Sequence, residues 1–165
     1  MMVTHDNRVL DAADRVINMV DGRIVSDVFI REAAMLCEFL AGITGFESLS
    51  PSALTGIAER MKPRRMRVGD ALVRQGEIGL ELFVIRSSKV HVLVNEGGRT
   101  RKLADLGQGD FFGERALITG EPRIATVTAI EDGIVYTLDK VSFQAALDSS
   151  PTFREQVLAV YFQRQ

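Results

Sequence analysis

The sequence is poor in the residues that mark secreted, metal-binding or membrane proteins. Its 165 residues hold one cysteine, Cys37, so no internal disulfide can form and a reducing, cytoplasmic setting is expected. His5 and His91 are the only histidines, and no metal-ligand spacing joins them to Cys37. No apolar run approaches the roughly 18 residues of a membrane span, and no signal-peptide pattern opens the chain. We therefore expect a soluble protein with no metal site and no direct membrane insertion.

The chain also has no large excess of either charge. Its formal net charge is −2, which argues against a general nucleic-acid or membrane-surface binder. One local basic cluster is interpreted as the solvated face of a helix end and a strand; it comprises Arg60, Lys62, Arg64, Arg65 and Arg67. With 46% hydrophobic residues, the chain can bury one core, or one core plus a small appendage.

The stretch from Gly109 to Thr126 carries the chemistry of the sequence. Glu114 is followed by small residues, and Arg123 comes after a Gly-Glu-Pro turn and enters a β-branched run. Gly113 frees the backbone to turn, and a short helical turn after it would direct unpaired N–H groups at an anion. A plain connection between two strands, with an incidental Glu/Arg surface pair, is equally compatible with these residue types.

The order of residues within this stretch distinguishes the two interpretations. Phe112-Gly113-Glu114, Ala116-Leu117-Ile118, Pro122-Arg123 and Ala125-Thr126 closely resemble the phosphate-binding cassette of cyclic nucleotide-binding domains. The resemblance implies that Glu114 accepts the ribose 2′-OH and that Arg123 binds the cyclic phosphate. It further implies backbone N–H donors at Ala116 and Ala125, close approach at Gly113, and apolar base contacts from Val92 and Leu103.

Three positions bear on how such a site would work. Ile124 follows the arginine where the family usually has a small residue or threonine; without a hydroxyl there, cAMP is favoured over cGMP, although the isoleucine could crowd either base. Ser88 replaces a common turn glycine, which leaves the shape of that turn open. Tyr161 or Phe162 could cover the base as part of a closing final helix, although core packing is an alternative role for both.

Residues 1–27 resemble a different family, the end of an ABC transporter ATPase domain. The segment has a candidate switch histidine, His5, then an Ala-Asp-Arg helix pattern and an Asp21-Gly22 hairpin signal. No Gly-rich phosphate loop, signature helix or Walker B carboxylate accompanies it, so no ATPase activity is expected. We interpret residues 1–27 as the remnant of such a domain.

The remaining chain predicts an α+β fold. Residues 28–45 are expected to connect the remnant through an amphipathic helix, Val28–Ala41, capped by Ser26 or Asp27; any exposed part of its apolar stripe could form a homodimer. Residues 46–165 are expected to form the nucleotide-binding domain. A helix begins after Ser50-Pro51 and runs to about Met61, period-two strands form an antiparallel β-roll or jelly roll, and two helices follow.

Two functions from different classes are compatible with these patterns. The first is a regulatory cyclic-nucleotide sensor that controls ABC transporter ATPase or permease subunits; the second is a ligand-free interaction or dimerisation domain of the same fold. An enzyme is not expected, because Glu114 and Arg123 have no nucleophile–base partner and no metal set. DNA binding is not expected either, because no helix-turn-helix pattern follows the last helix of the sequence.

Overall fold

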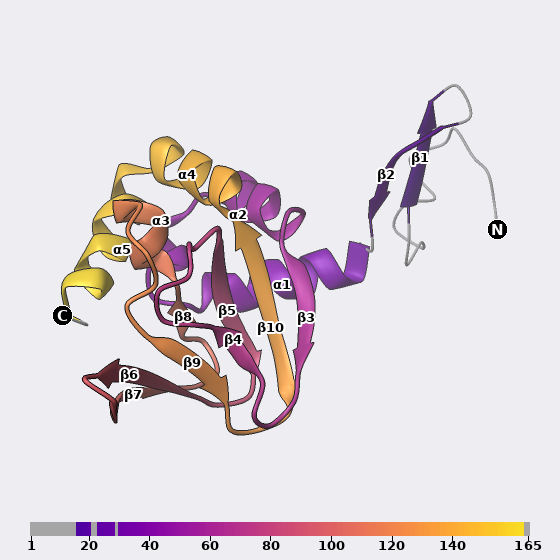
Figure 1. Cartoon of the computed structure of the whole chain (residues 1–165). Coiled ribbons are helices and arrows are strands. Elements are labelled where there is room, and N and C mark those ends of the chain that lie inside the picture. The colour runs from indigo at the N-terminus through magenta and orange to yellow at the C-terminus, as the bar shows by residue number, and fades with distance from the viewer. Residues whose placement is uncertain (1–15, 21–22, 29, 164–165) are drawn as a thin grey trace.

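A computed structural model describes residues 16–20, 23–28 and 30–163 (Figure 1). Strands β1 (Val16–Val20) and β2 (Arg23–Val28) pair antiparallel, with Val20 opposite Arg23. The hairpin predicted around Asp21-Gly22 is therefore confirmed in its two strands. The helix predicted ahead of it, together with His5, lies outside the described residues.

Helix α1 (Ile30–Ala41) begins later than predicted. Val28 belongs to β2, and so do Ser26 and Asp27, so neither Ser26 nor Asp27 is the expected helix cap. The predicted apolar stripe is present: Leu36 and Leu40 are buried, and Cys37 is half-buried with its Sγ 3.8 Å from the hydroxyl of Thr55.

A short 3₁₀ helix (Phe46–Ser48) and helix α2 (Pro51–Ala58) follow. The Ser50 hydroxyl accepts a hydrogen bond from the Ala53 amide at 3.2 Å, which confirms the predicted cap. The helix ends at Ala58, before the predicted boundary near Met61.

Two four-stranded antiparallel sheets make up the β-roll. The strand order is β3-β10-β5-β8 in the first sheet and β4-β9-β6-β7 in the second sheet. The strands are β3 (Lys62–Met66), β4 (Ala71–Val73), β5 (Glu81–Ser87), β6 (Val90–Glu96), β7 (Arg99–Leu106), β8 (Phe111–Phe112), β9 (Thr126–Ala129) and β10 (Gly133–Asp139). Helix α3 (Glu114–Thr119) lies in the connection between β8 and β9. The predicted antiparallel roll is thus confirmed, and its strands form two sheets.

Ser88 occupies the β5–β6 turn in a conformation that favours glycine, with φ 137°. Its hydroxyl proton is shared between two carbonyl oxygens, that of Glu131 at 2.7 Å and that of Lys89 at 3.1 Å. The turn left open by the sequence therefore forms with serine in the place of glycine, because the side chain makes bonds that glycine cannot make.

Helices α4 (Lys140–Ser149) and α5 (Pro151–Gln163) pack on the first sheet together with α1 and α2 (Figure 1). Asp139 caps α4, since its Oδ1 accepts from the Ser142 amide at 2.9 Å. One buried cluster joins these helices to the sheet, and it includes Phe46 and Phe153 with ring centroids 5.1 Å apart. A second cluster fills the space between the two sheets. The roll is thus supported on one side by helices, and the cassette helix α3 lies beside that support.

Candidate functional site

The site begins at the sharp turn from β8 into α3. Gly113 precedes the helix with φ 94°, a conformation that costs a residue with a Cβ energy. Glu114 is the first helical residue and is only 6% exposed. Because first-turn amides have no acceptor within their own helix, this end of α3 offers N–H donors beside a buried carboxylate.

Arg123 is the second charged residue of the site and is 8% exposed. Its Nη1 donates to the Gly113 carbonyl at 2.7 Å, and its Nη2 donates to the Glu81 carbonyl at 2.6 Å. A guanidinium carries five N–H donors, so these two bonds orient the group and leave others for an anion. The arginine is therefore held in place by the strand β5 and by the turn before α3.

The main chain of Arg123 is fixed as well. Its amide donates to the Glu77 carbonyl at 2.8 Å, and its carbonyl accepts from the Gly76 amide at 2.8 Å. Burial lowers the pKa of Arg123 from its ordinary value, while the carboxylates of Glu114, Glu81 and Glu77 oppose that change. Arginine remains charged in proteins, so the site keeps a partly desolvated cation.

Gly79 belongs to the site, although its sequence context indicates only a turn. A Cβ placed there would lie 2.6 Å from three atoms: the Ala116 Cβ and the Nε and Cζ of Arg123. The loop between β4 and β5 can pass this close to the guanidinium only because residue 79 has no side chain. No residue near Gly79 in the sequence indicates this contact, because Arg123 lies 44 residues later in the chain.

A cavity of about 840 Å³ opens in front of these groups. Its lining includes all seven predicted ligand residues and Ile124: Val92, Leu103, Gly113, Glu114, Ala116, Arg123, Ala125 and Ile124. The other lining residues are Val73, Val94, Glu96, Arg101, Ala104, Leu106, Phe112, Arg115, Pro122, Val127 and Gln163. The cavity therefore combines buried charged groups, Arg123 and Glu114, with many aliphatic side chains, and three further charged residues also line it: Glu96, Arg101 and Arg115. Such a space suits an anionic ligand that also carries an apolar ring and a hydroxyl group.

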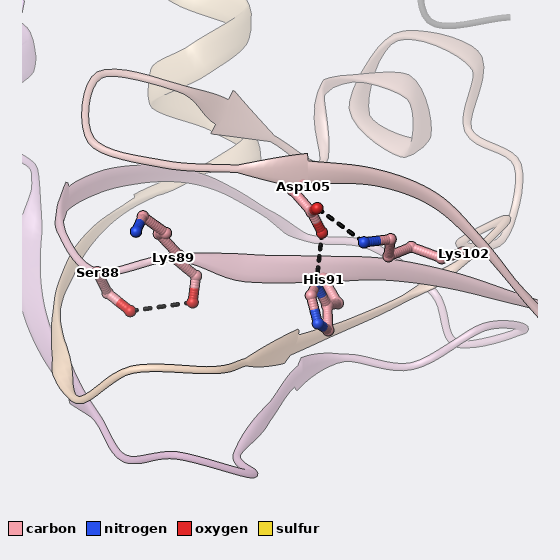
Figure 2. A network of polar contacts seen from close by, with 5 residues as sticks. All are labelled: Ser88, Lys89, His91, Lys102 and Asp105. Atoms are coloured by element: carbon pink, nitrogen blue, oxygen red, sulfur yellow. Dashed lines mark hydrogen bonds and ion pairs between the residues drawn. The ribbon is translucent and has the colours of Figure 1, made fainter.

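One wall of the cavity is the β6–β7 hairpin, which contains a bulge. Val92 faces Ala104 and Leu93 faces Lys102, so Leu103 has no partner on the opposite strand. On the opposite face of the same hairpin, Asp105 Oδ1 lies 2.5 Å from His91 Nδ1 and Asp105 Oδ2 accepts from Lys102 at 2.8 Å (Figure 2). These two contacts lower the pKa of the Asp105 carboxyl, with Lys102 the larger cause.

Comparison with known proteins identifies this combination of roll, turn and buried arginine. The family model for the cyclic nucleotide-binding domain matches residues 63–150. The chain belongs to the cyclic nucleotide-binding domain family. Within it, the chain is 34% identical over 128 residues to a cyclic nucleotide-gated potassium channel of Rhizobium etli, covering 78% of this chain and 35% of the channel. It is 40% identical over 113 residues to the cGMP-dependent protein kinase egl-4 of Caenorhabditis elegans, covering 67% of this chain and 14% of the kinase.

Solved structures agree with this assignment. The regulatory domain of Toxoplasma gondii PKA with cAMP matches with a TM-score of 0.67 and 27% identity, over 71% of this chain and 45% of that chain. The catabolite activator protein of Thermus thermophilus matches with a TM-score of 0.66 and 28% identity, over 73% and 57%. This cyclic nucleotide-binding domain thus spans about a third or less of the two curated relatives named above.

The final helix of the cyclic nucleotide-binding domain reaches the cavity through a residue that was not predicted. Gln163, at the end of α5, is part of the lining. Tyr161 is half-buried, and the Arg115 Cζ lies 5.8 Å from its ring centroid, whereas Phe162 is 66% exposed. The two predicted lid residues thus lie on the helix that borders the cavity, but neither Tyr161 nor Phe162 is among its lining residues, and Tyr161 lies beside Arg115 of α3.

The family match also bears on the class of protein. It describes a ligand-binding module and not a catalytic domain, so the matched residues are not those of an enzyme. Among residues 16–20, 23–28 and 30–163, no three His, Cys, Asp or Glu side chains gather in a way that could hold a metal ion. In the same described ranges, no helix has the length and apolar character needed to cross a bilayer.

Proposed function

We propose that residues 46–165 sense a 3′,5′-cyclic nucleotide and that cAMP is preferred over cGMP. The observation that carries this proposal is that Glu114 and Arg123 are both buried and both line one cavity, together with many aliphatic residues. Arg123 would bind the cyclic phosphate with the amides of Ala116 and Ala125, and Glu114 would accept the ribose 2′-OH. The purine would lie against Val92 and Leu103.

The base preference follows from the residues at the mouth of the cavity. Ile124 borders it with 45% of its surface exposed, and it has no hydroxyl to donate to or accept from a guanine. An apolar contact does not distinguish the exocyclic amino group of adenine from the exocyclic groups of guanine. The preference between cAMP and cGMP therefore depends on the free-energy cost of removing each base from water. Guanine exposes more polar groups than adenine, which favours cAMP here.

The controlled partner that we propose is an ABC transporter ATPase or permease subunit. The support is the resemblance of residues 1–27 to the end of an ABC transporter ATPase domain. Nucleotide binding would act on α3 and then on α5, which borders the cavity. The nucleotide can shift α5 from one position to another only if it binds the protein with different affinity in the two positions. In this proposal the chain works in the cytoplasm and reaches the membrane through the transporter complex.

Calorimetric titration with cAMP and cGMP tests the site directly. Replacing Arg123 with alanine removes charge-assisted hydrogen bonds that contribute roughly 1.5–3 kcal/mol, so cAMP affinity should fall about tenfold to over a hundredfold. The heat-unfolding temperature of the wild type should also rise with cAMP, because ligand binds the folded state. An Arg123→Ala variant that binds cAMP with unchanged affinity would refute the assignment.

A ligand-free interaction domain is the second candidate function, and one observation favours it. The Arg123 guanidinium already donates to two backbone carbonyls, so it could serve the fold without any ligand. In that case, millimolar cAMP or cGMP would leave the unfolding temperature unchanged. A homodimer through the exposed part of α1, where Met35 is 59% exposed, would then appear as concentration-dependent light scattering.

A further inference from the structure

A run of cations lies along the outer edge of the first sheet. The run, called here the basic edge, comprises Arg60, Lys62, Arg64, Arg65 and Arg67. All five residues are exposed. Strand β3, which carries three of them, pairs with β10 on one side only and is the last strand of its sheet (Figure 1).

The basic edge holds five cations within residues 60–67. Some exposed cations elsewhere pair with carboxylates, as in Lys89–Glu131 at 3.2 Å, Lys102–Asp105 at 2.8 Å and Arg154–Asp148 at 2.6 Å. Within residues 32–163, the exposed cations Arg74, Arg99 and Lys140 make no such pair. In the same range, residues 32–163, no carboxylate lies within 4.0 Å of the charged group of any of the five side chains of the basic edge. Five like charges in eight positions repel one another, and an anionic partner would relieve that repulsion.

The geometry of β3 indicates what kind of anionic partner fits. Consecutive side chains of a strand point to opposite faces of the sheet, so Arg64 and Arg65 lie on different faces. A flat surface such as a bilayer can contact only one of these faces. A narrow chain that lies along the free edge of β3 can reach the cations on both faces.

We propose that the basic edge docks an extended, acidic segment of a partner protein. Such a segment places carboxylates on both sides of its own backbone with the same two-residue alternation as β3. Pro63, which has no N–H, and the like charges oppose pairing of the edge with a second copy of itself. A chain of opposite charge removes the repulsion, and its carboxylates can bind the arginine side chains even where Pro63 offers no backbone donor.

The nucleotide cavity and the basic edge are separate surfaces. No residue of β3 or β10 lines the cavity, and its lining comes mainly from the second sheet, α3 and the loop before β9, with Phe112 of β8 from the first sheet. The partner segment and a nucleotide can therefore bind together. Because β3 directly follows α2, a segment bound there also contacts the junction between the helices and the roll.

Fluorescence anisotropy with a fluorescein-labelled peptide of ten glutamates tests the proposal at about 150 mM salt. The charged peptide is extended by its own repulsion, so it represents the proposed segment. We expect Arg64→Glu and Arg65→Glu each to weaken binding about three- to thirtyfold, since each replaces an attraction with a repulsion. Arg74→Glu and Arg99→Glu change the net charge equally on exposed residues outside the basic edge and should shift affinity by less than about twofold.

Several results would overturn the proposal. They are no peptide binding by the wild type, equal losses in the control variants, or a loss in only one of the two edge variants. Flotation with phosphatidylcholine vesicles containing phosphatidylserine, and titration with a DNA duplex, complete the test. If either of these binds the wild type through Arg64 and Arg65 while the peptide does not, the partner is a membrane or a nucleic acid instead. A circular-dichroism spectrum and an unfolding temperature equal to those of the wild type show that each variant is folded, whether or not the protein binds cAMP.

Discussion

The close approach of Gly79 to Arg123 gives the sharpest test of how the anion site is built. Replacing Gly79 with alanine places a Cβ 2.6 Å from the Arg123 Nε, the Arg123 Cζ and the Ala116 Cβ. Ordinary contacts between heavy atoms lie at about 3.5–4.0 Å, so an overlap of about 1 Å must be relieved. Ala116 is fixed in α3, and the arginine side chain is the part that can move.

The size of the effect follows from the bonds that such a movement disturbs. The guanidinium is held at 2.7 Å from the Gly113 carbonyl and 2.6 Å from the Glu81 carbonyl, and a shift of about 1 Å breaks this geometry. Losing the alignment of one or two charge-assisted bonds to the ligand costs roughly 1.5–3 kcal/mol, which is about a 10- to 150-fold loss of cAMP affinity. Overpacking should also lower the free energy of unfolding by about 1–3 kcal/mol.

Isothermal titration calorimetry with cAMP measures the first quantity, and urea unfolding measures the second. Gly107→Ala is the matched control, because Gly107 also lies in a loop and an added Cβ there meets only the Lys89 Cγ at 4.0 Å. Its affinity should equal that of the wild type. A Gly79→Ala protein that is folded and binds cAMP as tightly as Gly107→Ala would show that the loop does not position Arg123.

Two further predictions concern the stability of the fold. Asp139→Ala should lower the free energy of unfolding by about 0.5–2 kcal/mol at pH 7, because the carboxylate caps α4 through the Ser142 amide at 2.9 Å. This bond lowers the pKa of Asp139 from its ordinary value of 3.8. The stabilisation is therefore present above pH 3.8 and is lost as the pH falls through the lowered pKa of the folded protein. Unfolding temperatures measured at several pH values should differ between variant and wild type at pH 7 and converge at that acidic pH. Ser88→Ala should cost about 1 kcal/mol in urea unfolding, because the strained φ remains while the hydroxyl bonds to Glu131 and Lys89 are lost. Ser88→Gly relieves the strain and should be more stable than the alanine variant, and the reverse order would contradict the role given to the turn.

Local signals accounted for most of the fold. Ser50, Asp139 and Ser150 each precede a helix by one residue and each accepts a bond from an amide three residues later. Such caps depend on neighbouring residues alone, so they can be predicted from the sequence. The antiparallel roll follows from the alternation of apolar residues and from the glycine-rich turns.

The errors occurred where pairing between distant or ambiguous segments decided the outcome. Val28 could continue the helix by its periodicity, but pairing with Val16 extends β2 to that residue instead. Likewise, nothing near Gly79 in the sequence shows that Arg123 lies against it, and nothing near Gln163 shows that α5 ends at the cavity. These contacts are set by the packing of α3 and α5 on the roll.

The bulge at Leu103 has a consequence for how the pocket could change over evolutionary time. A residue that lines the cavity from a paired strand is constrained twice: by its contact with the ligand, and by its contact with the residue opposite it on the neighbouring strand. Leu103 borders the cavity but faces no residue on β6, so only the first constraint applies to it. Substitutions there can alter the fit of a base without disturbing the strand register. Position 103 is thus a place where ligand preference could diverge among descendants of this chain at a small structural cost.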